Sequence, residues 1–283
     1  MSTYAPPAPV AARLTPCTAA YTRLTEVLPA FRVTEVVAGA PLPDGQGWFS
    51  GEDLASGGAA LDAYLAQEDA ATLRDHGRQA RPDVVATFGL HRYAWPACLL
   101  ITLPWFLQRR VPRLPAGAFA YHRRTARLAV RAGEFTCLPD DPAASSPYAR
   151  TADEEGLRAA VREAVAEHLG PVLDAFRRRV RRRDRALWGL ATDEIVEGLT
   201  YLGGLLGEGE RARRETAALL PGRTTPFAQG ADFRTLTGPA GEALPTRTRA
   251  SCCMYYTLEP ADTCVTCPRT CDSERVERLA SAG

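Results

Sequence analysis

Five of the eight cysteines in this 283-residue chain lie close to its C-terminal end. Four of the five follow the pattern Cys-Cys-x10-Cys-x2-Cys, at Cys252, Cys253, Cys264 and Cys267. Thiolates are soft, strongly donating ligands, and four of them in one short segment are typical of a zinc site or an iron–sulfur cluster. The first expectation from the sequence is therefore a metal or cluster site here.

The spacing separates these two kinds of site only in part. A zinc ribbon uses two Cys-x2-Cys turns, whereas the first half here is the adjacent pair Cys252-Cys253. Neighbouring side chains of an extended chain point in opposite directions, so both reach one metal ion only where the backbone bends. A cluster with two irons relaxes that requirement. The spacing favours a [2Fe-2S] cluster and leaves structural zinc open.

The other cysteines stand apart from this pattern. Cys271 follows it closely and is either a spare thiol or a substitute for one of the four. Cys17, Cys98 and Cys137 are isolated in the sequence and are expected to be buried core thiols.

This C-terminal segment resembles a known family. The motif, preceded by an arginine and followed by an aromatic residue, is similar to that of the FhuF-type ferric-siderophore reductases. The stretch Ala186-Leu187-Trp188-Gly189-Leu190-Ala191 is similar to the segment that precedes the cysteines in that family. The resemblance covers roughly the C-terminal half. It implies that Cys252, Cys253, Cys264 and Cys267 hold a [2Fe-2S] cluster that passes one electron to an Fe(III)-siderophore, with a hydroxamate as the expected type.

The chemistry implied by this resemblance needs no base or nucleophile. Siderophores hold Fe(III) through hard oxygen donors, and the same donors hold the less charged Fe(II) far more weakly. One-electron reduction is therefore a release mechanism, and the enzyme would be a ferric-siderophore reductase. No nucleotide-binding fingerprint is visible, because the glycine-rich stretch 203–209 lacks both a preceding strand and a Lys-Ser/Thr pair. The expected partner is an external electron donor, a ferredoxin-like protein or a flavin reductase.

Two other functions stay open at this stage. The first is a non-redox siderophore-binding or biosynthesis-related protein with a structural zinc site formed by the four cysteines. The second is a one-electron carrier without specificity for iron siderophores.

Several polar clusters are candidates for contacts with substrate or partners. Residues that could line a substrate pocket are Arg92, Tyr93, His122, Arg123 and Arg124. Seven arginines between Arg177 and Arg185 form either a solvated face or a docking patch for an acidic donor or an anionic siderophore. Arg249 is close enough in sequence to donate to a cluster sulfur, and Tyr255 and Tyr256 could shield the cluster.

Composition sets the limits on the class of protein. The chain is 46% hydrophobic and 24% charged with a net charge of +1, and all 34 basic residues are arginine. This balance gives no electrostatic case for nucleic acid as a partner. Met1–Val10 has no signal-peptide pattern, and the apolar run 94–107 is too short for a transmembrane segment. A cytoplasmic protein with reduced thiols is expected.

The periodicity of apolar residues predicts a helix-dominated α+β fold. We expect a C-terminal half, 148–283, built as a helical bundle that carries the iron–sulfur loop 249–271, and an N-terminal α+β half, 1–147. Helices are expected from about 16, 53, 82, 153, 171, 195 and 208, with breaks at Gly170-Pro171 and Gly203-Gly204. The small antiparallel sheet is a hairpin over 118–137 that turns at Ala132-Gly133, and 224–248 reads as loop.

Overall fold

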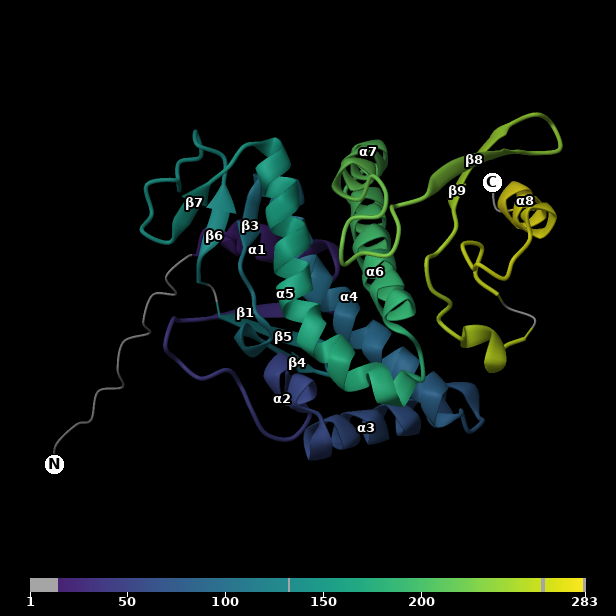
Figure 1. Cartoon of the computed structure of the whole chain (residues 1–283), viewed down its shortest axis with the longest axis horizontal. Helices are drawn as coiled ribbons and strands as arrows, with labels where there is room; N and C mark the ends of the chain where they lie inside the picture. The colour runs from purple at the N-terminus through teal and green to yellow at the C-terminus, as the bar shows by residue number, and fades with distance from the viewer. Residues whose placement is uncertain (1–14, 132, 261–262, 282–283) are drawn as a thin grey trace, which may run out of the picture.

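The longest apolar stretch of the chain forms α4 (Pro82–Gln108), which lies at the centre of the fold in the computed structural model (Figure 1). The structure describes residues 15–131, 133–260 and 263–281. Pro82 occupies the first turn, where its missing N–H needs no partner. In those ranges α4 is the one helix long and apolar enough to cross a membrane, and 83% of its most apolar window is buried by the rest of the chain. That burial is typical of a core helix.

Two long helices pack beside α4, namely α5 (Glu154–Val180) and α6 (Asp184–Leu205), and α7 (Gly209–Leu219) packs on α6. The carboxylate of Asp153 caps α5 by accepting the Gly156 N–H at 2.8 Å. The predicted stripe of α5, which includes Leu157 and Val161, is fully buried. Helical periodicity therefore located the starts of α5 and α7, whereas α6 begins at Asp184, before the start expected near residue 195.

The predicted break at Gly170-Pro171 is wrong, because α5 continues through it to Val180. Pro171 lies on the exposed side of the helix, while Leu169 and Val172 on either side of it are fully buried. A proline inside a helix costs about 3 kcal/mol. Burial of the flanking apolar side chains offsets that cost and keeps the helix in one piece.

The remaining helices are shorter or lie at the edges of the fold. They are α1 (Thr18–Val27), α2 (Gly51–Ser56), α3 (Gly58–His76) and α8 (Asp272–Ser281), with 3-10 turns at Ala116–Ala118 and Tyr255–Thr257. The single helix expected from Asp53 is two helices, because Gly57 adopts a φ of +71° that ends the first one.

Within the described residues the strands form three small sheets. The first has the order β1 (Arg32–Val36), β5 (Arg127–Arg131), β4 (Phe119–His122), β2 (Trp48–Ser50); the second has the order β3 (Arg110–Pro112), β6 (Phe135–Cys137), β7 (Ala149–Thr151); the third is the pair β8 (Phe233–Thr237), β9 (Ala243–Arg247). The β1–β5 and β6–β7 pairs are parallel, and the others are antiparallel.

Two predictions about strands are corrected by this topology. The hairpin is β4–β5, which turns over 123–126 with Ala126 at a φ of +51°, and β6 pairs with β3 and β7 instead of β5. The expected turn residue Ala132 lies outside the described residues. The segment 224–248, expected to be loop, contains the β8–β9 hairpin, whose alternation is weak because both strands are largely exposed.

One large cluster of buried apolar side chains runs from Cys17 to Ala231 and includes Trp105, Phe176 and Leu199. Cys17, Cys98 and Cys137 are buried, as predicted. The helix-dominated α+β class is confirmed. The division into halves at residue 147 stays a prediction.

Candidate functional site

The motif cysteines and Cys271 lie on the cluster segment (residues 249–271), which runs beside α6 on the same side as β8 and β9 and away from the other two sheets (Figure 1). The start of the cluster segment packs closely against α6. A Cβ on Gly189 would lie 3.2 Å from the Cβ of Ala250, so a larger residue at 189 would push the segment away. Trp188 packs edge-on to Phe227 with ring centroids 5.7 Å apart. The Trp-Gly pair of α6 thus shapes the surface on which the segment lies.

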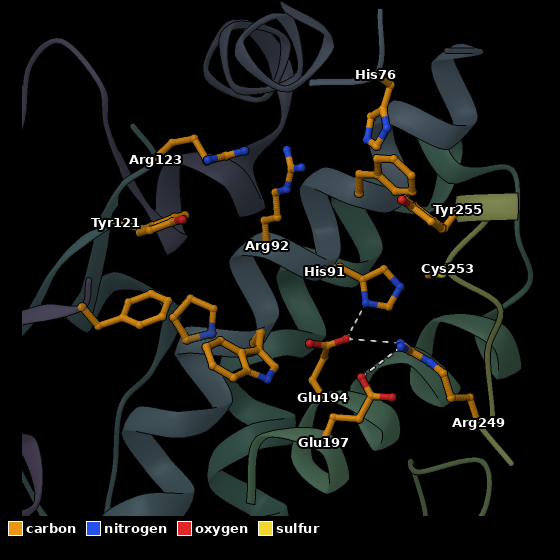
Figure 2. Close-up of a pocket in the computed structure, with 14 residues that line it drawn as sticks. His76, His91, Arg92, Tyr121, Arg123, Glu194, Glu197, Arg249, Cys253 and Tyr255 are labelled. Atoms are coloured by element: carbon orange, nitrogen blue, oxygen red, sulfur yellow. Dashed lines mark hydrogen bonds and ion pairs between the residues drawn. The ribbon is translucent and has the colours of Figure 1, made fainter. Parts of the chain in front are cut away.

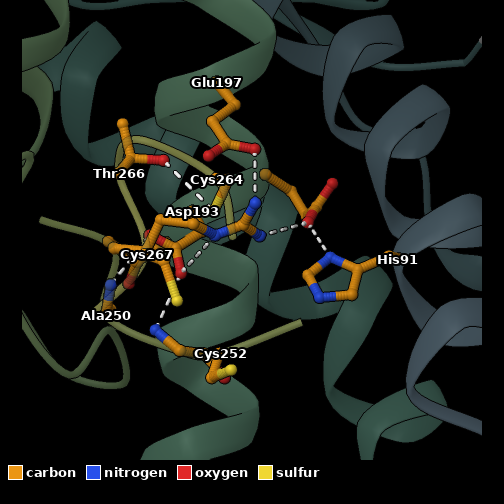
Figure 3. A network of polar contacts seen from close by, with 12 residues as sticks. His91, Asp193, Glu197, Ala250, Cys252, Cys264, Thr266 and Cys267 are labelled. Carbon is orange, nitrogen blue, oxygen red and sulfur yellow. Dashed lines mark hydrogen bonds and ion pairs between the residues drawn. The ribbon is translucent and has the colours of Figure 1, made fainter. Parts of the chain in front are cut away.

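Asp193, in the middle of α6, holds the backbone that leads into the cysteine pair. It is fully buried, and its two oxygens accept the N–H groups of Ala250 at 2.9 Å and Ser251 at 2.8 Å. The same carboxylate pairs with the guanidinium of Arg247, which is 5% exposed. Figure 3 shows this attachment next to the cysteines. These charge-assisted hydrogen bonds fix the position of the backbone at the start of the cluster segment.

Backbone amides donate hydrogen bonds to three of the motif sulfurs, those of Cys252, Cys253 and Cys267. The Met254 N–H donates to Cys252 Sγ at 3.5 Å, and the Arg269 N–H donates to Cys267 Sγ at 3.4 Å. Met254, directly after the cysteine pair, adopts a φ of +69°, which turns the backbone where it leaves the pair. In each bond the donor is the second residue after the cysteine. Amide donors of this kind stabilise thiolates and tune the potential of an iron–sulfur centre.

Two of the four thiols, Cys253 and Cys264, are hydrogen-bonded to each other, and Cys252 and Cys267 interact electrostatically. The Cys264 thiol hydrogen-bonds to Cys253, and this bond, with a further one from the Tyr255 amide, lowers the pKa of Cys253 to about 5 against the effect of burial. Because it donates that bond, Cys264 has a raised pKa. The pKa of Cys252 is raised by burial and by the neighbouring Cys267. Two pairs of thiols suit a two-iron centre in which each iron takes two thiolates.

Within the described ranges, no three His, Cys, Asp or Glu side chains converge as they would around a single metal ion. Cys271 lies outside the two pairs. It is exposed at the start of α8, with its sulfur 3.1 Å from Ser273 Oγ. The donor set that fits a [2Fe-2S] cluster is therefore the four motif cysteines.

Arg275, which lies in α8, binds the backbone of the second half of the cluster segment. Its side chain is 1% exposed and donates to the carbonyls of Val265 at 2.6 Å, Cys267 at 3.0 Å and Thr270 at 3.1 Å. One planar guanidinium thereby satisfies three buried carbonyls. A tight turn that presents two cysteines is thus tied to α8.

A cavity of about 510 Å³ opens beside Cys253, between α4, α6 and the cluster segment (Figure 2). Its apolar walls are aromatic, with Phe31, Phe88, Trp95, Tyr121 and Tyr255. Its polar side chains are His76, His91, Arg92, Arg123, Glu194, Glu197 and Arg249. Cys253 is the one motif cysteine among the lining residues described. A ligand in this cavity would therefore lie next to the cluster.

The floor of the cavity is a buried acid–base network (Figures 2 and 3). Arg249 donates to Glu197 at 2.9 Å and lies 3.8 Å from Glu194, which in turn hydrogen-bonds to Nδ1 of His91. Burial raises the pKa of Glu194 to about 8 and lowers that of His91 to about 4, with Arg249 adding to the second effect. At neutral pH the Glu194–His91 pair therefore carries one proton and no net charge.

Two of the five predicted pocket residues line this cavity. Arg92 donates to Glu68 at 2.6 Å, and Arg123 pairs with the same carboxylate, which is fully buried behind them. Helix α4 and the β4–β5 turn, distant in sequence, are brought together by Glu68 from α3. Arg92 and Arg123 are thereby held side by side on one wall.

The other three predicted pocket residues lie elsewhere. Tyr93 is buried in the core and hydrogen-bonds to His168 Nε2 at 2.9 Å. His122 contacts the Trp48 ring edge-on and accepts from Thr125. Arg124 is exposed in the turn after β4. None of these three is among the described lining residues of the cavity.

Sequence reasoning missed the acidic partners, which are Glu68, Asp193, Glu194 and Glu197. A signal was present in α6, where Asp193-Glu194 interrupts a run of apolar residues on both sides. Acidic residues in such a run are buried, and buried charges need cationic partners. Arg247 and Arg249, just before the cysteines, are those partners.

The tyrosines that flank the motif have different surroundings. Tyr255 lines the cavity and meets the His76 ring edge-on, with centroids 5.6 Å apart. Tyr256 lies under the guanidinium of Arg269, which is 4.1 Å from its ring centroid. Arg249 contacts carboxylates of α6 in every ion pair described for it.

Comparison with known protein families identifies this segment. Residues 249–269 match the family model described as the FhuF 2Fe-2S C-terminal domain. A search of curated proteins found no match. The match includes all four motif cysteines and ends before Cys271, and the helices α1 to α7 lie outside it. Over residues 249–269 the chain is similar to a FhuF-type [2Fe-2S] domain, as its sequence predicted.

Proposed function

We propose that this FhuF-type iron–sulfur protein is a ferric-siderophore reductase, which passes one electron from a cluster held by Cys252, Cys253, Cys264 and Cys267 to a ferric complex in the adjoining cavity. The observation that supports this most directly is that Cys253 both belongs to the motif and lines the cavity. A bound complex and the cluster would be separated by little more than one side chain.

The charges around the cavity favour a ferric hydroxamate. Arg92 and Arg123 share Glu68, and Arg249 is balanced by Glu197, so no large excess of positive charge faces the ligand. Three monoanionic hydroxamates on Fe(III) give a neutral centre, whereas three dianionic catecholates leave a charge of −3. A balanced site suits the neutral complex, because a trianion would need unpaired cations. The aromatic walls suit the apolar linkers of such a ligand.

The protein side chains bind and orient the substrate, and they take part in no bond-making step. When bound, the cluster supplies one electron at a time. Arg92 and Arg123 can hydrogen-bond to the oxygen atoms of the ferric complex, and the rings of Trp95 and Tyr121 can exclude water from its surface. After reduction the oxygen donors hold Fe(II) weakly, so the metal leaves.

The proposal also includes an outside source of electrons, a ferredoxin-like protein or a flavin reductase, and a cytoplasmic location. The proposal of an outside electron source rests on the chemistry of the site, where the described residues provide a one-electron centre and a substrate cavity. A non-redox protein with structural zinc at the same cysteines is the alternative. Colourless purified protein with one zinc per chain would favour it.

The test uses anaerobically purified protein whose cluster has been reduced with dithionite and freed of excess reductant. Mixing with a ferric trihydroxamate should reoxidise the cluster, seen as recovery of its visible absorption, while an Fe(II) chelator captures one iron per electron. A cluster that stays reduced would contradict the proposal.

A pocket variant makes the test specific to the cavity. Trp95→Ala should lower the second-order rate of reoxidation by about tenfold or more, because it removes an aromatic wall that holds the ligand. Its visible and EPR spectra should be unchanged. Trp48→Ala is the matched control, since Trp48 packs on His122 and Arg127 outside the cavity. Equal rates in the two variants would place the substrate elsewhere.

A further inference from the structure

The densest positive charge of the chain lies where α5 turns into α6. We call this stretch, Arg177–Arg185, the arginine turn; it contains seven arginines and one aspartate. All of its arginines are exposed except Arg182, which is half-buried. Sequence alone left open whether it is a solvated face or a docking patch.

Much of this charge has no acidic partner. Arg177 pairs with Asp174 and Asp184, and Arg179 pairs with Asp62. Among the residues that the structure describes, no carboxylate lies within ion-pair distance of the exposed Arg178, Arg181, Arg183 or Arg185. By contrast, Arg158 and Arg162 in the first half of α5 both pair with Glu155. The arginine turn therefore keeps a strong net positive potential.

The arginine turn also touches the cluster segment. Arg182 Nη1 donates to Ser251 Oγ at 3.1 Å, and Ser251 directly precedes Cys252. The substrate cavity reaches the segment at the next residue, Cys253, and no residue of the arginine turn is among its described lining residues. The two adjacent cysteines thus lie toward different surroundings. Cys253 lies toward the aromatic cavity, and Cys252 lies toward the basic surface of the arginine turn.

We infer that the arginine turn is the docking surface of an acidic one-electron carrier protein, which reduces the cluster from the Cys252 side while the ferric complex occupies the cavity on the Cys253 side. This inference rests on the proposed function. Complementary charge steers an acidic carrier to such a surface and raises its association rate. One electron leaves the carrier and enters the cluster; no bond forms or breaks, and no proton is required.

Binding of the carrier and the ferric complex on separate sides of the cluster has a kinetic consequence. If donor and substrate approached through one opening, each would have to leave before the other could bind. With two sides, the carrier can bind while the ferric complex is in place, so electron delivery continues at saturating substrate. Steady-state kinetics should then show both bound together, with no competition between carrier and ferric complex.

The experiment measures cluster reduction by stopped flow with fully reduced flavodoxin, an acidic FMN carrier, as the probe. The variant Arg181→Glu/Arg183→Glu/Arg185→Glu reverses three exposed charges, and the last two changes place glutamates where α6 begins, which suits a helix N-terminus. The control Arg124→Glu/Arg150→Glu/Arg214→Glu makes the same change in net charge at exposed positions on other elements.

We expect the arginine-turn variant to reduce the association rate at low ionic strength at least tenfold, and the control by less than threefold. The wild-type rate should fall steeply with added salt, and the variant's should not. Reduction by photoreduced 5-deazariboflavin, a small neutral reductant, should be the same in all three proteins. Equal flavodoxin rates in variant and control would overturn the inference.

Two further results would distinguish failure of the docking inference from failure of the reductase proposal. If the arginine-turn variant lost salt-dependent binding to duplex DNA while its flavodoxin rate matched the control, the surface would serve nucleic acid and the inference would fail. If the reduced cluster did not pass its electron to ferric hydroxamate, the reductase proposal would fail. The flavodoxin comparison would still report on docking, because it contains no siderophore.

Discussion

Different interactions stabilise the interior of the helical body and the interior of the cluster lobe, which we define as residues 233–281. The body buries aromatic and aliphatic side chains in one continuous core, with Trp105, Phe106 and Phe176 fully buried. The residues buried in the lobe are mostly polar, among them Thr246, Arg247, Ser251, Thr270 and Arg275. Its main apolar anchor is Leu258, which packs on Val84, Val85 and Phe88 of α4.

This difference predicts how each region responds to change. Apolar burial contributes about 25 cal/mol per Å² whatever is bound, so the body should fold without the cluster. The lobe has little apolar surface to bury and depends on guanidinium and thiolate contacts. Its order should therefore depend on the cluster, as it does in small domains in which metal binding supplies the folding free energy. The predictions below test this contrast.

The largest effect is expected from removing a cluster ligand. Cys253→Ser should abolish the visible absorption and leave the lobe open to proteases, while the far-UV circular dichroism of the body changes little. Limited proteolysis followed by mass spectrometry checks this, with cuts expected only after about residue 230. Cys271→Ala is the control and should keep its full spectrum, because Cys271 is exposed and bonded to Ser273. Cuts spread over α4 and α5 would contradict the contrast.

The next effect is expected at the contact between the two regions. Asp193→Asn removes the buried carboxylate that pairs with Arg247 and leaves Glu197, 3.6 Å away, as the remaining acidic partner described for that guanidinium. Breaking a buried pair in this way costs about 3–5 kcal/mol. The loss should appear as faster hydrogen exchange in the lobe and weaker cluster retention. Asp174→Asn, an exposed partner of Arg177, should change neither. Exchange that rises equally in α4 would show that Asp193 supports the body instead.

A third prediction concerns the pH dependence of the stability of the helical body. His168 is buried between Tyr93 and the Leu114 carbonyl, and burial lowers its pKa from 6.5 to about 4. Between these two values the unfolded chain binds a proton that the folded protein excludes, so stability falls as pH falls from about 6.5 to 4. The loss is at most about 3 kcal/mol.

Denaturant unfolding of the body at several pH values measures this loss. His168→Gln should be less stable at pH 7 and should show a flatter dependence below pH 6.5, because the titrating group is gone. Unchanged pH slopes in this variant would assign the acid sensitivity to other groups.

The smallest of the four effects is expected within the lobe. Arg275→Lys keeps the charge but loses the planar fork that reaches three carbonyls, and each lost bond to a charged donor costs about 1.5–3 kcal/mol before lysine and water replace part of it. A net loss of about 2 kcal/mol should lower the temperature at which the cluster bleaches. Arg234→Lys, on an exposed pair with Asp272, should not shift it.

The amino-acid sequence was most informative where one chemical pattern determines the outcome. Helical spacing predicted α4 to α7, and the cysteine motif predicted the segment that matches the FhuF-type domain. It failed at Pro171, where a local rule was outweighed by burial on both sides. It also failed at the hairpin, because the alternation of Leu128 and Val130 shows that a strand exists without showing which strand it pairs with.

The cavity was harder to predict for a physical reason. Arg92 and Arg123 were candidates, but so were Tyr93, His122 and Arg124, and local sequence makes them equivalent. What separates them is Glu68, contributed by a different helix and buried behind the first two. A partner distant in sequence carries no local signal. Pocket membership therefore follows from tertiary packing, whereas the cysteine motif can be recognised from its spacing in the sequence.

The floor of the cavity has a consequence for the speed of electron transfer. Arg249 is 9% exposed in its side chain and is surrounded by Asp193, Glu194 and Glu197, so it has no room to swing when charge appears nearby. Dipoles that are already oriented need not rearrange as an electron arrives or leaves. The surroundings of Cys253 should thus have a small reorganisation energy, and a rigid floor of this kind lets a modest driving force give a fast transfer.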